Sequence, residues 1–328
     1  MLKATHVLVT GAGGFIASHL VERLVAEGAH VRAFVRYNSR GDAGLLRLLP
    51  AEVYAQLDVV AGDLRDSEAV RAAMKDVDTV FHLGALIAIP YSYLHPREVI
   101  ETNIMGTLNV LMSARDLDTR RVVHTSTSEV YGTAQYVPID EAHPLQGQSP
   151  YSASKIGADK IAESFYRAFD VPVVTIRPFN TYGPRQSARA VIPTIITQAL
   201  TSDTVYLGSL DPSRDFTYVL DTAEGFLLGA LAEGVEGEEL NLGNDATITI
   251  GELCEKIFGI LGKTPQVVSE SVRKRPERSE VLKLQASYSK AKGMIGWEPK
   301  VTLEEGLRKT IAWVSEHLDM YQVDSYTV

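Results

Sequence analysis

The chain has 328 residues, of which 45% are hydrophobic and 22% charged, and its formal net charge is −9. A chain of this length is expected to fold as one large or two unequal domains, and its apolar runs are too short to cross a membrane. The acidic balance argues against a nucleic-acid partner, which needs a basic surface.

The first strand-like run begins at His6, which leaves little room for an export signal before it. The single cysteine, Cys254, has no partner for a disulfide or a cysteine metal site, so we expect it to lie packed in a core. Both features predict a cytoplasmic protein.

Runs rich in valine and isoleucine alternate with amphipathic, helix-like segments in the first half of the chain. These runs cover 6–10, 30–35, 59–63, 79–83, 121–127 and 171–178. Such alternation predicts an α/β fold with a doubly wound parallel sheet.

Past about residue 180, prolines and irregular stretches interrupt the pattern and predict a smaller mixed α/β domain. We expect residues 1–180 to form the first domain, with about 205–243 returning to it, and 181–204 with 244–328 to form the second. In the last helix-like segment, Thr302 and Glu305 are spaced for a capping box.

A glycine cluster, "TGAGGFIASHL" (10–20), joins the first strand to a helix. Gly11 and Gly14 permit a tight turn and let a pyrophosphate approach the helix N-terminus, where free N–H groups favour an anion. A glycine cluster in this position predicts a dinucleotide site.

The end of the second strand, "FVRYNSR" (34–40), bears on which dinucleotide is held. It lacks the acid that would hold a ribose 2′-hydroxyl, whereas Arg36 with Ser39 or Arg40 suits a 2′-phosphate. This favours NADP over NAD. Asp63, after the third strand, either accepts from the adenine amino group or caps the helix that follows.

The segment "YSASK" places Tyr151 and Lys155 four residues apart, on one face of a predicted helix. A lysine ammonium beside a phenol lowers the phenol's pKa and makes it a usable base. Thr127, at the end of the fifth strand, is expected to bring a hydroxyl alongside.

At this point the chain resembles the extended short-chain dehydrogenase/reductases that act on nucleotide sugars. The resemblance rests on "TGAGGFIASHL", "AGDLRD", "ETNIMGTLNV", "TSTSEVYG", "YSASK", "RPFNTYGPRQ" and "RDFTYVLD", in that order. It implies a Rossmann domain, a triad of Thr127, Tyr151 and Lys155, and a supporting role for Asn103 beside the lysine. It also implies cofactor contacts from Phe15, Ile16, Leu64 and Leu83, and a homodimer that pairs through helices at about 100–114 and 151–168.

The acid in "TSTSEVYG" narrows the reaction that the resemblance implies, because members that only epimerise C4 generally lack it. Once C4 is oxidised, the C5 proton is acidic, and Glu129 is expected to remove it before the C6 hydroxyl leaves as water. Familiar hexose 4,6-dehydratases have an aspartate at the position of Ser128. Serine is a poorer acid, so Ser128 orients the hydroxyl, relays a proton from Glu129, or caps the next turn.

The segment "STSEVYGTAQYVPIDEAHPLQGQSPYSASKIGAD" and the loop "ALIAIPYSY" most resemble 4,6-dehydratases of nonulosonic (legionaminic-type) acid pathways. In "PSRDF" the decarboxylases more often have an alanine between the arginine and the phenylalanine, which argues against decarboxylation. The resemblance therefore predicts an NDP-sugar 4,6-dehydratase acting on UDP- or GDP-N-acetylglucosamine. The alternatives are an NDP-sugar 4-epimerase, a UDP-glucuronate decarboxylase that shares the Thr-Ser-Glu string, and a non-catalytic NAD(P)-binding sensor.

The resemblance also implies the residues that hold the nucleotide sugar. Asn180, Arg214 and Arg275 or Arg278 are expected at the diphosphate, and Ser92 at the sugar. The sequence shows no His/Asp/Glu cluster with metal-ligand spacing. His82 and His124 lie within apolar strands and are expected to be core histidines with satisfied hydrogen bonds.

Overall fold

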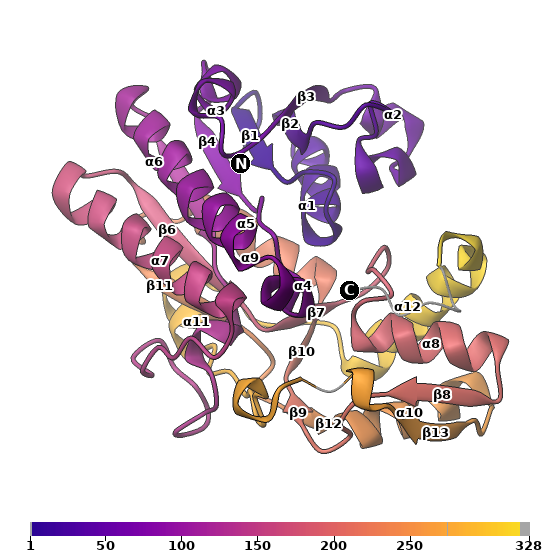
Figure 1. The fold of residues 1–328 in the computed structure, drawn as a ribbon. Helices are drawn as coiled ribbons and strands as arrows, with labels where there is room; N and C mark the ends of the chain where they lie inside the picture. The colour runs from indigo at the N-terminus through magenta and orange to yellow at the C-terminus, as the bar shows by residue number, and fades with distance from the viewer. Residues whose placement is uncertain (1, 274, 322–328) are drawn as a thin grey trace.

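A seven-stranded parallel sheet forms the centre of the computed structural model, which describes residues 2–273 and 275–321 (Figure 1). Its strand order is β11-β6-β5-β4-β1-β2-β3. The strands are β1 (His6–Thr10), β2 (His30–Arg36), β3 (Asp58–Gly62), β4 (Thr79–His82), β5 (Arg121–Thr125), β6 (Val173–Pro178) and β11 (Glu239–Leu242). The order reverses at β1, as in a doubly wound sheet, and the predicted fold class is confirmed.

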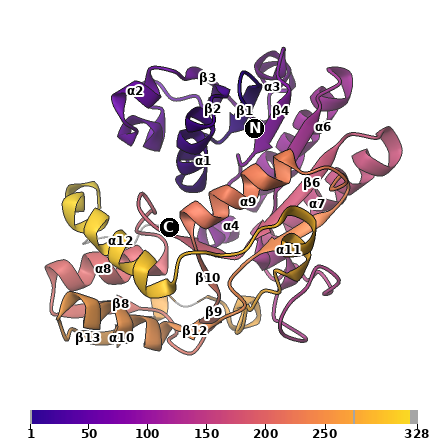
Figure 2. The same ribbon diagram turned by 180° about the vertical axis from the view of Figure 1, so that it is seen from behind.

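Helices cover both faces of the sheet, as Figures 1 and 2 show. One face carries α1 (Phe15–Ala26), α9 (Val219–Leu231) and α11 (Ser289–Ile295), and the other α3 (Ser67–Met74), α6 (Gly106–Asp116) and α7 (Pro150–Phe169). Side chains alternate along each strand, so Val7 and Val9 join the α1 core while Leu8 joins the α6 core. Both faces are therefore apolar, which explains the near-continuous Val/Ile runs.

Short elements follow the carboxyl ends of the strands, where ligands bind in such sheets. They are η1 (Gly44–Leu48), α2 (Ala51–Tyr54), α4 (Ile89–Leu94), α5 (Pro96–Ile100), the π turn η2 (Glu101–Met105) and the 3-10 turn η3 (Ser128–Tyr131).

A second, smaller core lies beside this edge of the sheet. It is built from α8 (Val191–Thr201), α10 (Ile250–Leu261) and α12 (Leu303–Glu316) with the strand pairs β7 (Asn180–Tyr182) and β10 (Phe216–Tyr218), β9 (Ser213–Arg214) and β12 (Ile248–Thr249), and β8 (Thr204–Leu207) and β13 (Gln266–Ser269). The turns η4 (Ser271–Arg273), η5 (Glu277–Ser279) and η6 (Leu318–Met320) complete the described chain. Cys254 is buried in this core, as expected.

The start of α12 differs in one respect from the predicted capping box. The Thr302 hydroxyl accepts from the backbone N–H of Glu305, as in such a box. The Glu305 carboxylate, however, pairs with Lys309 at 2.7 Å, one helical turn further on. An i,i+4 ion pair thus takes the carboxylate that the reciprocal half of the box would use.

Each core includes segments that the sequence analysis assigned to the other domain. Of the stretch 205–243, only α9 and β11 pack with the sheet, whereas Phe216 and Tyr218 belong to the second core. In the other direction, α11 returns to the sheet from the stretch 244–328 and buries Ala291 and Ile295 there. None of the described helices has the length and apolarity needed to span a membrane.

Candidate active site

The turn after β1 is shaped by two glycines from different strands. Gly11 has a φ of +64°, and a Cβ at this position would lie 2.6 Å from the Cα of Gly84. The next helix, α1, begins after Gly14, whose lack of a side chain leaves the first N–H groups of the helix uncovered. This turn has the close backbone approach and the helix N-terminus that a dinucleotide pyrophosphate requires.

A cavity of about 120 Å³ lies beside this turn. Its lining consists of Gly11, Phe34, Arg36, Gly62, Asp63, Leu64, Gly84, Ala85, Leu86 and Thr102. Four predicted cofactor residues, Gly11, Arg36, Asp63 and Leu64, therefore surround one space. Glycines at three of the four strand ends leave room for a flat ring, so the chain's residues fit a dinucleotide cofactor.

The charges at the rim of this cavity are paired. Asp63 contacts Arg65 at 2.6 Å, and this hydrogen bond lowers the pKa of the Asp63 carboxyl. Arg36 is 64% exposed and contacts Glu98 at 3.2 Å. The other predicted contacts lie just outside the lining, where Phe15, Ile16 and Leu83 are partly buried against the two cores.

Tyr151 and Lys155 lie at the start of α7, which Ser149 and Ser152 cap reciprocally. Tyr151 is 7% exposed, and its phenol is hydrogen-bonded to Thr127 from the end of β5. Burial raises the pKa of Tyr151, the Thr127 hydroxyl lowers it, and the charges of Glu129 and Asp159 raise it. Tyr151 and Thr127 are thus in contact, and Lys155 lies one turn further along α7.

Burial has the largest influence on the pKa of Tyr151 and raises it, so the pKa of the phenol is not lowered overall. The ammonium of Lys155 donates to the backbone oxygen of Thr125 at 2.5 Å. Burial lowers the pKa of Lys155 to about 8, against the opposing charge of Asp159.

Asn103 supports this helix through its neighbour Ser154. Its side-chain amide donates to the Leu86 backbone oxygen and to the Ser154 hydroxyl, both at 2.9 Å, and accepts from the Leu86 N–H at 2.8 Å. Ser154 in turn donates to the Tyr151 backbone oxygen. Both donors and the oxygen of the amide are hydrogen-bonded, which fixes the first turn of α7 against the loop after β4.

A buried polar cluster lies behind Lys155. Asp159 accepts from Ser126 at 2.7 Å and from Arg177 at 3.2 Å, and contacts His124 at 3.1 Å. Arg177 continues the cluster to Tyr131, and Tyr131 donates to the Asn241 side chain at 2.7 Å. These partners lower the pKa of Asp159 to about 2 against its burial.

The predicted C5 base lies on the turn after β5. Thr127 caps this turn by accepting from the backbone N–H of Glu129 at 3.2 Å. Ser128 is 3% exposed. The Glu129 carboxylate lies 3.5 Å from Arg275 Nη1, too far for a strong hydrogen bond.

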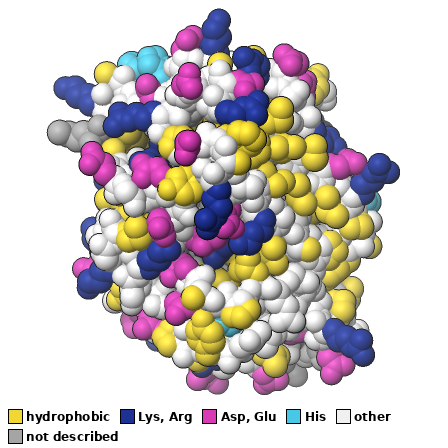
Figure 3. Space-filling model, turned by 90° about the vertical axis from the view of Figure 1, so that its left-hand side faces the viewer, with side chains coloured by type: hydrophobic (Ala, Val, Ile, Leu, Met, Phe, Trp, Pro, Cys, Tyr) yellow, Lys and Arg dark blue, Asp and Glu magenta, His cyan; other side chains and the backbone are white. Residues whose placement is uncertain are grey.

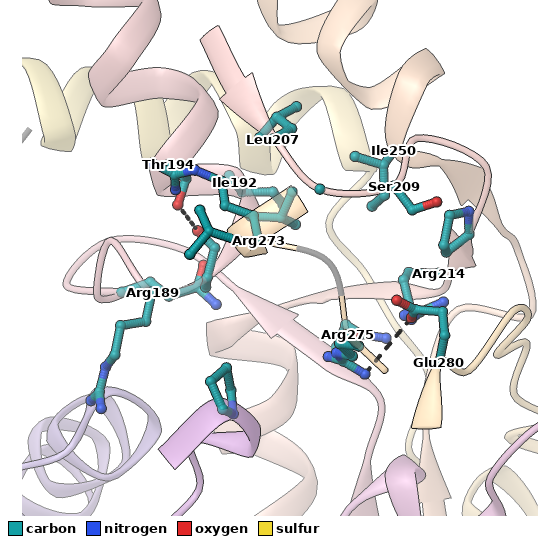
Figure 4. Close-up of a pocket in the computed structure, with 18 of the residues that line it drawn as sticks. Arg189, Ile192, Thr194, Leu207, Ser209, Arg214, Ile250, Arg273, Arg275 and Glu280 are labelled. Atoms are coloured by element: carbon teal, nitrogen blue, oxygen red, sulfur yellow. Dashed lines mark hydrogen bonds and ion pairs between the residues drawn. The ribbon is translucent and has the colours of Figure 1, made fainter. Parts of the chain in front are cut away.

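Arg275, the contact of Glu129, lines a larger pocket of about 560 Å³. Arg275, Arg214 and Glu280 line one side, and Figure 4 shows Ile192, Leu207 and Ile250 on the other. Glu280 lies 3.3 Å from Arg214 and 3.9 Å from Arg275. The pocket therefore has a cationic wall and an apolar wall, which suits a nucleoside diphosphate.

The predicted substrate residues divide into two groups. Asn180, Arg214 and Arg275 line the pocket. Ser92 is fully buried and donates to the backbone oxygen of Ile89 within its own helix, and Arg278 is exposed outside the lining. The structure thus differs from the prediction at these two positions.

Several lining residues were not predicted. They include Tyr93, next to Ser92, together with Arg189, Ser209, Arg273 and Glu280. Tyr93 donates to or accepts from the Ser279 hydroxyl at 2.6 Å and so joins α4 to the turn η5. The only sequence signal for Glu280 was an acid placed among arginines in "RKRPERSE". Within the described residues, no group of three or more His, Cys, Asp and Glu side chains is arranged to hold a metal ion.

Comparison with known proteins gives consistent matches over nearly the whole chain. The profile of the family described as "GDP-mannose 4,6 dehydratase" matches residues 8–310. A dTDP-glucose 4,6-dehydratase of Actinoplanes sp. is 33% identical over 94% of this chain and 97% of its own.

Among solved structures, DesIV, a dTDP-glucose 4,6-dehydratase of Streptomyces venezuelae with NAD and TYD bound, has a TM-score of 0.86. It is 30% identical and covers 97% of this chain and 99% of its own. A UDP-N-acetylglucosamine 4-epimerase of Methanobrevibacter ruminantium has a TM-score of 0.85 at 29% identity, covering 96% of this chain and 99% of its own.

Proposed function

The chain belongs to the GDP-mannose 4,6-dehydratase family of extended short-chain dehydrogenase/reductases, and from that premise we propose that it catalyses the 4,6-dehydration of an NDP-linked N-acetylhexosamine. The product is the 4-keto-6-deoxy sugar. The observation that carries this proposal is the position of Glu129, whose carboxylate lies 3.5 Å from Arg275 and whose charge acts on the buried Tyr151.

Each proposed step uses a named side chain. Tyr151, hydrogen-bonded to Thr127, accepts the proton of the C4 hydroxyl, and the Lys155 ammonium compensates the negative charge that this requires. Glu129 removes the C5 proton, which the 4-keto group acidifies, and delivers a proton to the C6 hydroxyl, which leaves as water. When bound, the nicotinamide dinucleotide supplies the two-electron acceptor that takes a hydride from C4 and returns it to C6.

The pocket supports a nucleoside diphosphate as the group that anchors the sugar. Arg214 and Arg275 supply planar donors for phosphate oxygens, and Asn180 lies beside them in the lining. UDP- or GDP-N-acetylglucosamine is the proposed substrate, supported by the likeness of "ALIAIPYSY" to hexosamine dehydratases. dTDP-glucose, named for several relatives, is the main competitor.

A C4 epimerase is the second candidate, because Ser128 replaces the acid expected beside the departing hydroxyl. Its buried hydroxyl is a far poorer proton donor than a carboxylic acid. If water loss were impossible here, oxidation at C4 and reduction from the other face would be the remaining reaction.

Product masses distinguish these reactions. The purified protein is incubated separately with UDP-N-acetylglucosamine, GDP-N-acetylglucosamine, dTDP-glucose and UDP-glucuronate, without added cofactor. Loss of one water supports the dehydratase and identifies the sugar, an unchanged mass with a changed C4 configuration supports the epimerase, and loss of carbon dioxide supports the decarboxylase. Failure to turn over any of them would favour the sensor.

The Glu129→Gln variant tests the role of the carboxylate. Without a C5 base, the reaction should stop at the 4-keto stage with reduced cofactor accumulating, and kcat should fall about 10²- to 10⁴-fold. Unchanged turnover would remove Glu129 from the mechanism. Tyr151→Phe should abolish turnover without any reduced cofactor, because the first oxidation is then blocked.

For the cofactor, we retain NADP as the proposal, supported by Arg36 and the lack of an acid at the end of β2. The pairing of Arg36 with Glu98 and the NAD bound in DesIV favour NAD. The mass of the dinucleotide released on denaturation decides between them. A cytoplasmic location is proposed on the unpaired Cys254.

A homodimer through α6 and α7 is also proposed. Apolar side chains are exposed along this face, and Figure 3 shows them on the side of the molecule that carries both helices. They are Ile100 (43%), Met105 (45%), Met112 (41%) and Phe169 (50%). Exposed apolar surface of this kind indicates an interface, and the molar mass in solution tests it.

A further inference from the structure

A buried chain of hydrogen bonds runs from the dinucleotide turn to the π turn before α6. The Gly84 N–H donates to Thr10 Oγ1 at 3.0 Å, and Thr10 Oγ1 lies 2.8 Å from His82 Nδ1. His82 Nε2 lies 3.0 Å from Thr107 Oγ1, which donates to the Asn103 backbone oxygen at 2.7 Å. Thr10, His82, Thr107 and Asn103 are each at most 3% exposed.

The partners define the direction of every bond in this chain. Thr107 gives its proton to Asn103, so it accepts from His82, whose proton must be on Nε2. The Thr10 oxygen already accepts from Gly84, and its proton is directed at the unprotonated Nδ1 of His82. A neutral imidazole therefore fits all four bonds. Burial, followed by His124 and Lys155, lowers the pKa of His82, which keeps the ring neutral.

This chain of hydrogen bonds ends where the helix geometry is irregular. Asn103 lies in the π turn Glu101–Met105. The Thr107 hydroxyl, four residues on, donates to the Asn103 backbone oxygen. The Asn103 side chain then leads through Ser154 to the backbone of Tyr151.

We propose that His82 is a positioning residue: it fixes the spacing between the turn that receives the dinucleotide and the helix that carries Tyr151 and Lys155. One end of the chain touches Gly84, which lies against Gly11, and the other reaches the start of α7 through Asn103 and Ser154. His82 and Thr107 are both absent from the lining of the larger pocket, so these hydrogen bonds do not act on the nucleotide sugar directly.

Paired variants separate this role from simple packing. The side-chain amide of asparagine reaches the place of Nδ1 but falls short of Thr107, whereas that of glutamine reaches the place of Nε2. We expect His82→Asn to lower kcat about 10- to 100-fold, because displacement of about 1 Å at a hydride-transfer site has effects of this size. His82→Gln keeps the contact to Thr107, which leads to Tyr151, but loses the one to Thr10, so it should lower kcat less than His82→Asn does; KM for the nucleotide sugar should stay within about 2-fold in both.

Thr107 gives the same test without altering the imidazole. Thr107→Val removes the hydroxyl and should lower kcat as His82→Asn does, whereas Thr107→Ser should restore it. The double variant His82→Asn/Thr107→Val should be no worse than either single variant, because both break one chain. Thr119→Val is the matched control. The Thr119 hydroxyl is buried without a hydrogen-bond partner, and it lies just before the amino end of β5, away from the carboxyl ends of the strands where the sites lie.

A second readout does not depend on turnover. Hydrogen exchange of the peptide 101–107 should be faster in His82→Asn and Thr107→Val and unchanged in Thr119→Val. Normal kcat in the first two variants of an active enzyme would overturn the proposal, and so would unchanged exchange. The kinetic readout rests on the proposed function. If the wild type turns over none of the nucleotide sugars, that function fails while the exchange measurement still decides the role of His82.

Discussion

Two charge clusters flank the catalytic helix, and they differ in how completely their charges are paired. Behind Lys155, Asp159 is buried and contacts Ser126, His124 and Arg177 at 2.7 to 3.2 Å. In the substrate pocket, Arg275 meets Glu129 at 3.5 Å and Glu280 at 3.9 Å, and its buried Nη1 makes no hydrogen bond of standard geometry. In the first cluster the Asp159 carboxylate is paired on every side, although His124 Nδ1 has no partner, whereas in the second the Arg275 guanidinium has capacity left for an anionic ligand.

The comparison predicts opposite consequences of mutation. Loss of a partner in the cluster behind Lys155 should act on folding, because it leaves a buried charge without compensation. Loss of a partner in the pocket should act on ligand binding, because the arginines there are not yet fully hydrogen-bonded.

The largest effect is expected for Asp159→Asn. The buried Arg177 guanidinium would lose its main anionic partner, and the free energy of unfolding should fall by about 3–5 kcal/mol. Denaturation in urea measures it. The matched control is Glu239→Gln, because Glu239 also contacts Arg177, at 3.0 Å, but is 28% exposed; it should cost at most about 1 kcal/mol. Equal losses would contradict the distinction between the two sites.

The pocket cluster is tested by Arg275→Ala. Loss of a charge-assisted contact to the diphosphate should raise KM for the nucleotide sugar about 10- to 100-fold, the equivalent of about 1.5–3 kcal/mol. The free energy of unfolding should change by less than about 1 kcal/mol. Arg278→Ala, three residues on and exposed, is the control and should leave KM within about 2-fold. A large loss of stability without a change in KM would place Arg275 with the structural cluster.

The pH dependence of stability provides a third test, and it concerns the cluster behind Lys155. The folded-state pKa of Asp159 is about 2, below the usual value of 3.8, so the folded state binds fewer protons than the unfolded state between these values. Its contribution to stability is therefore present above pH 3.8 and is lost as pH falls towards 2. It should amount to about 2 kcal/mol. The stability difference between wild type and Asp159→Asn should shrink by about this amount over that pH range, and a constant difference would contradict the assignment.

The smallest effect is expected for Ser128→Ala. If Glu129 performs both proton transfers, turnover should stay within about 3-fold of the wild type. Accumulation of reduced cofactor during turnover would instead show that the Ser128 hydroxyl relays a proton. Single-turnover absorbance of the nicotinamide distinguishes these outcomes.

The sequence predicted the parts of the molecule that depend on local periodicity. The six predicted strands are present, because a parallel sheet covered on both faces requires continuous Val/Ile runs. The turn at Gly11 and the spacing of Tyr151 and Lys155 were also predictable, since each depends on neighbours within one turn.

The sequence could not predict features that depend on contacts between distant segments. Lys155 donates to the Thr125 backbone, and burial has the largest influence on the pKa of Tyr151; neither could be read from the spacing of the two residues. Arg275 and Arg278 are equivalent in sequence, and only the fold of the segment places one in the pocket and the other in solvent. The return of α11 to the sheet depends on tertiary packing in the same way.

The close approach of Gly11 to Gly84 has a consequence for how such a protein can change during evolution. The floor of the dinucleotide groove is made by two backbones in contact, so its shape does not depend on the choice of side chain elsewhere. The larger pocket is lined mainly by side chains from the second core and from loops, which can be replaced one at a time. New sugar specificities can therefore arise on this scaffold while the redox half stays unchanged.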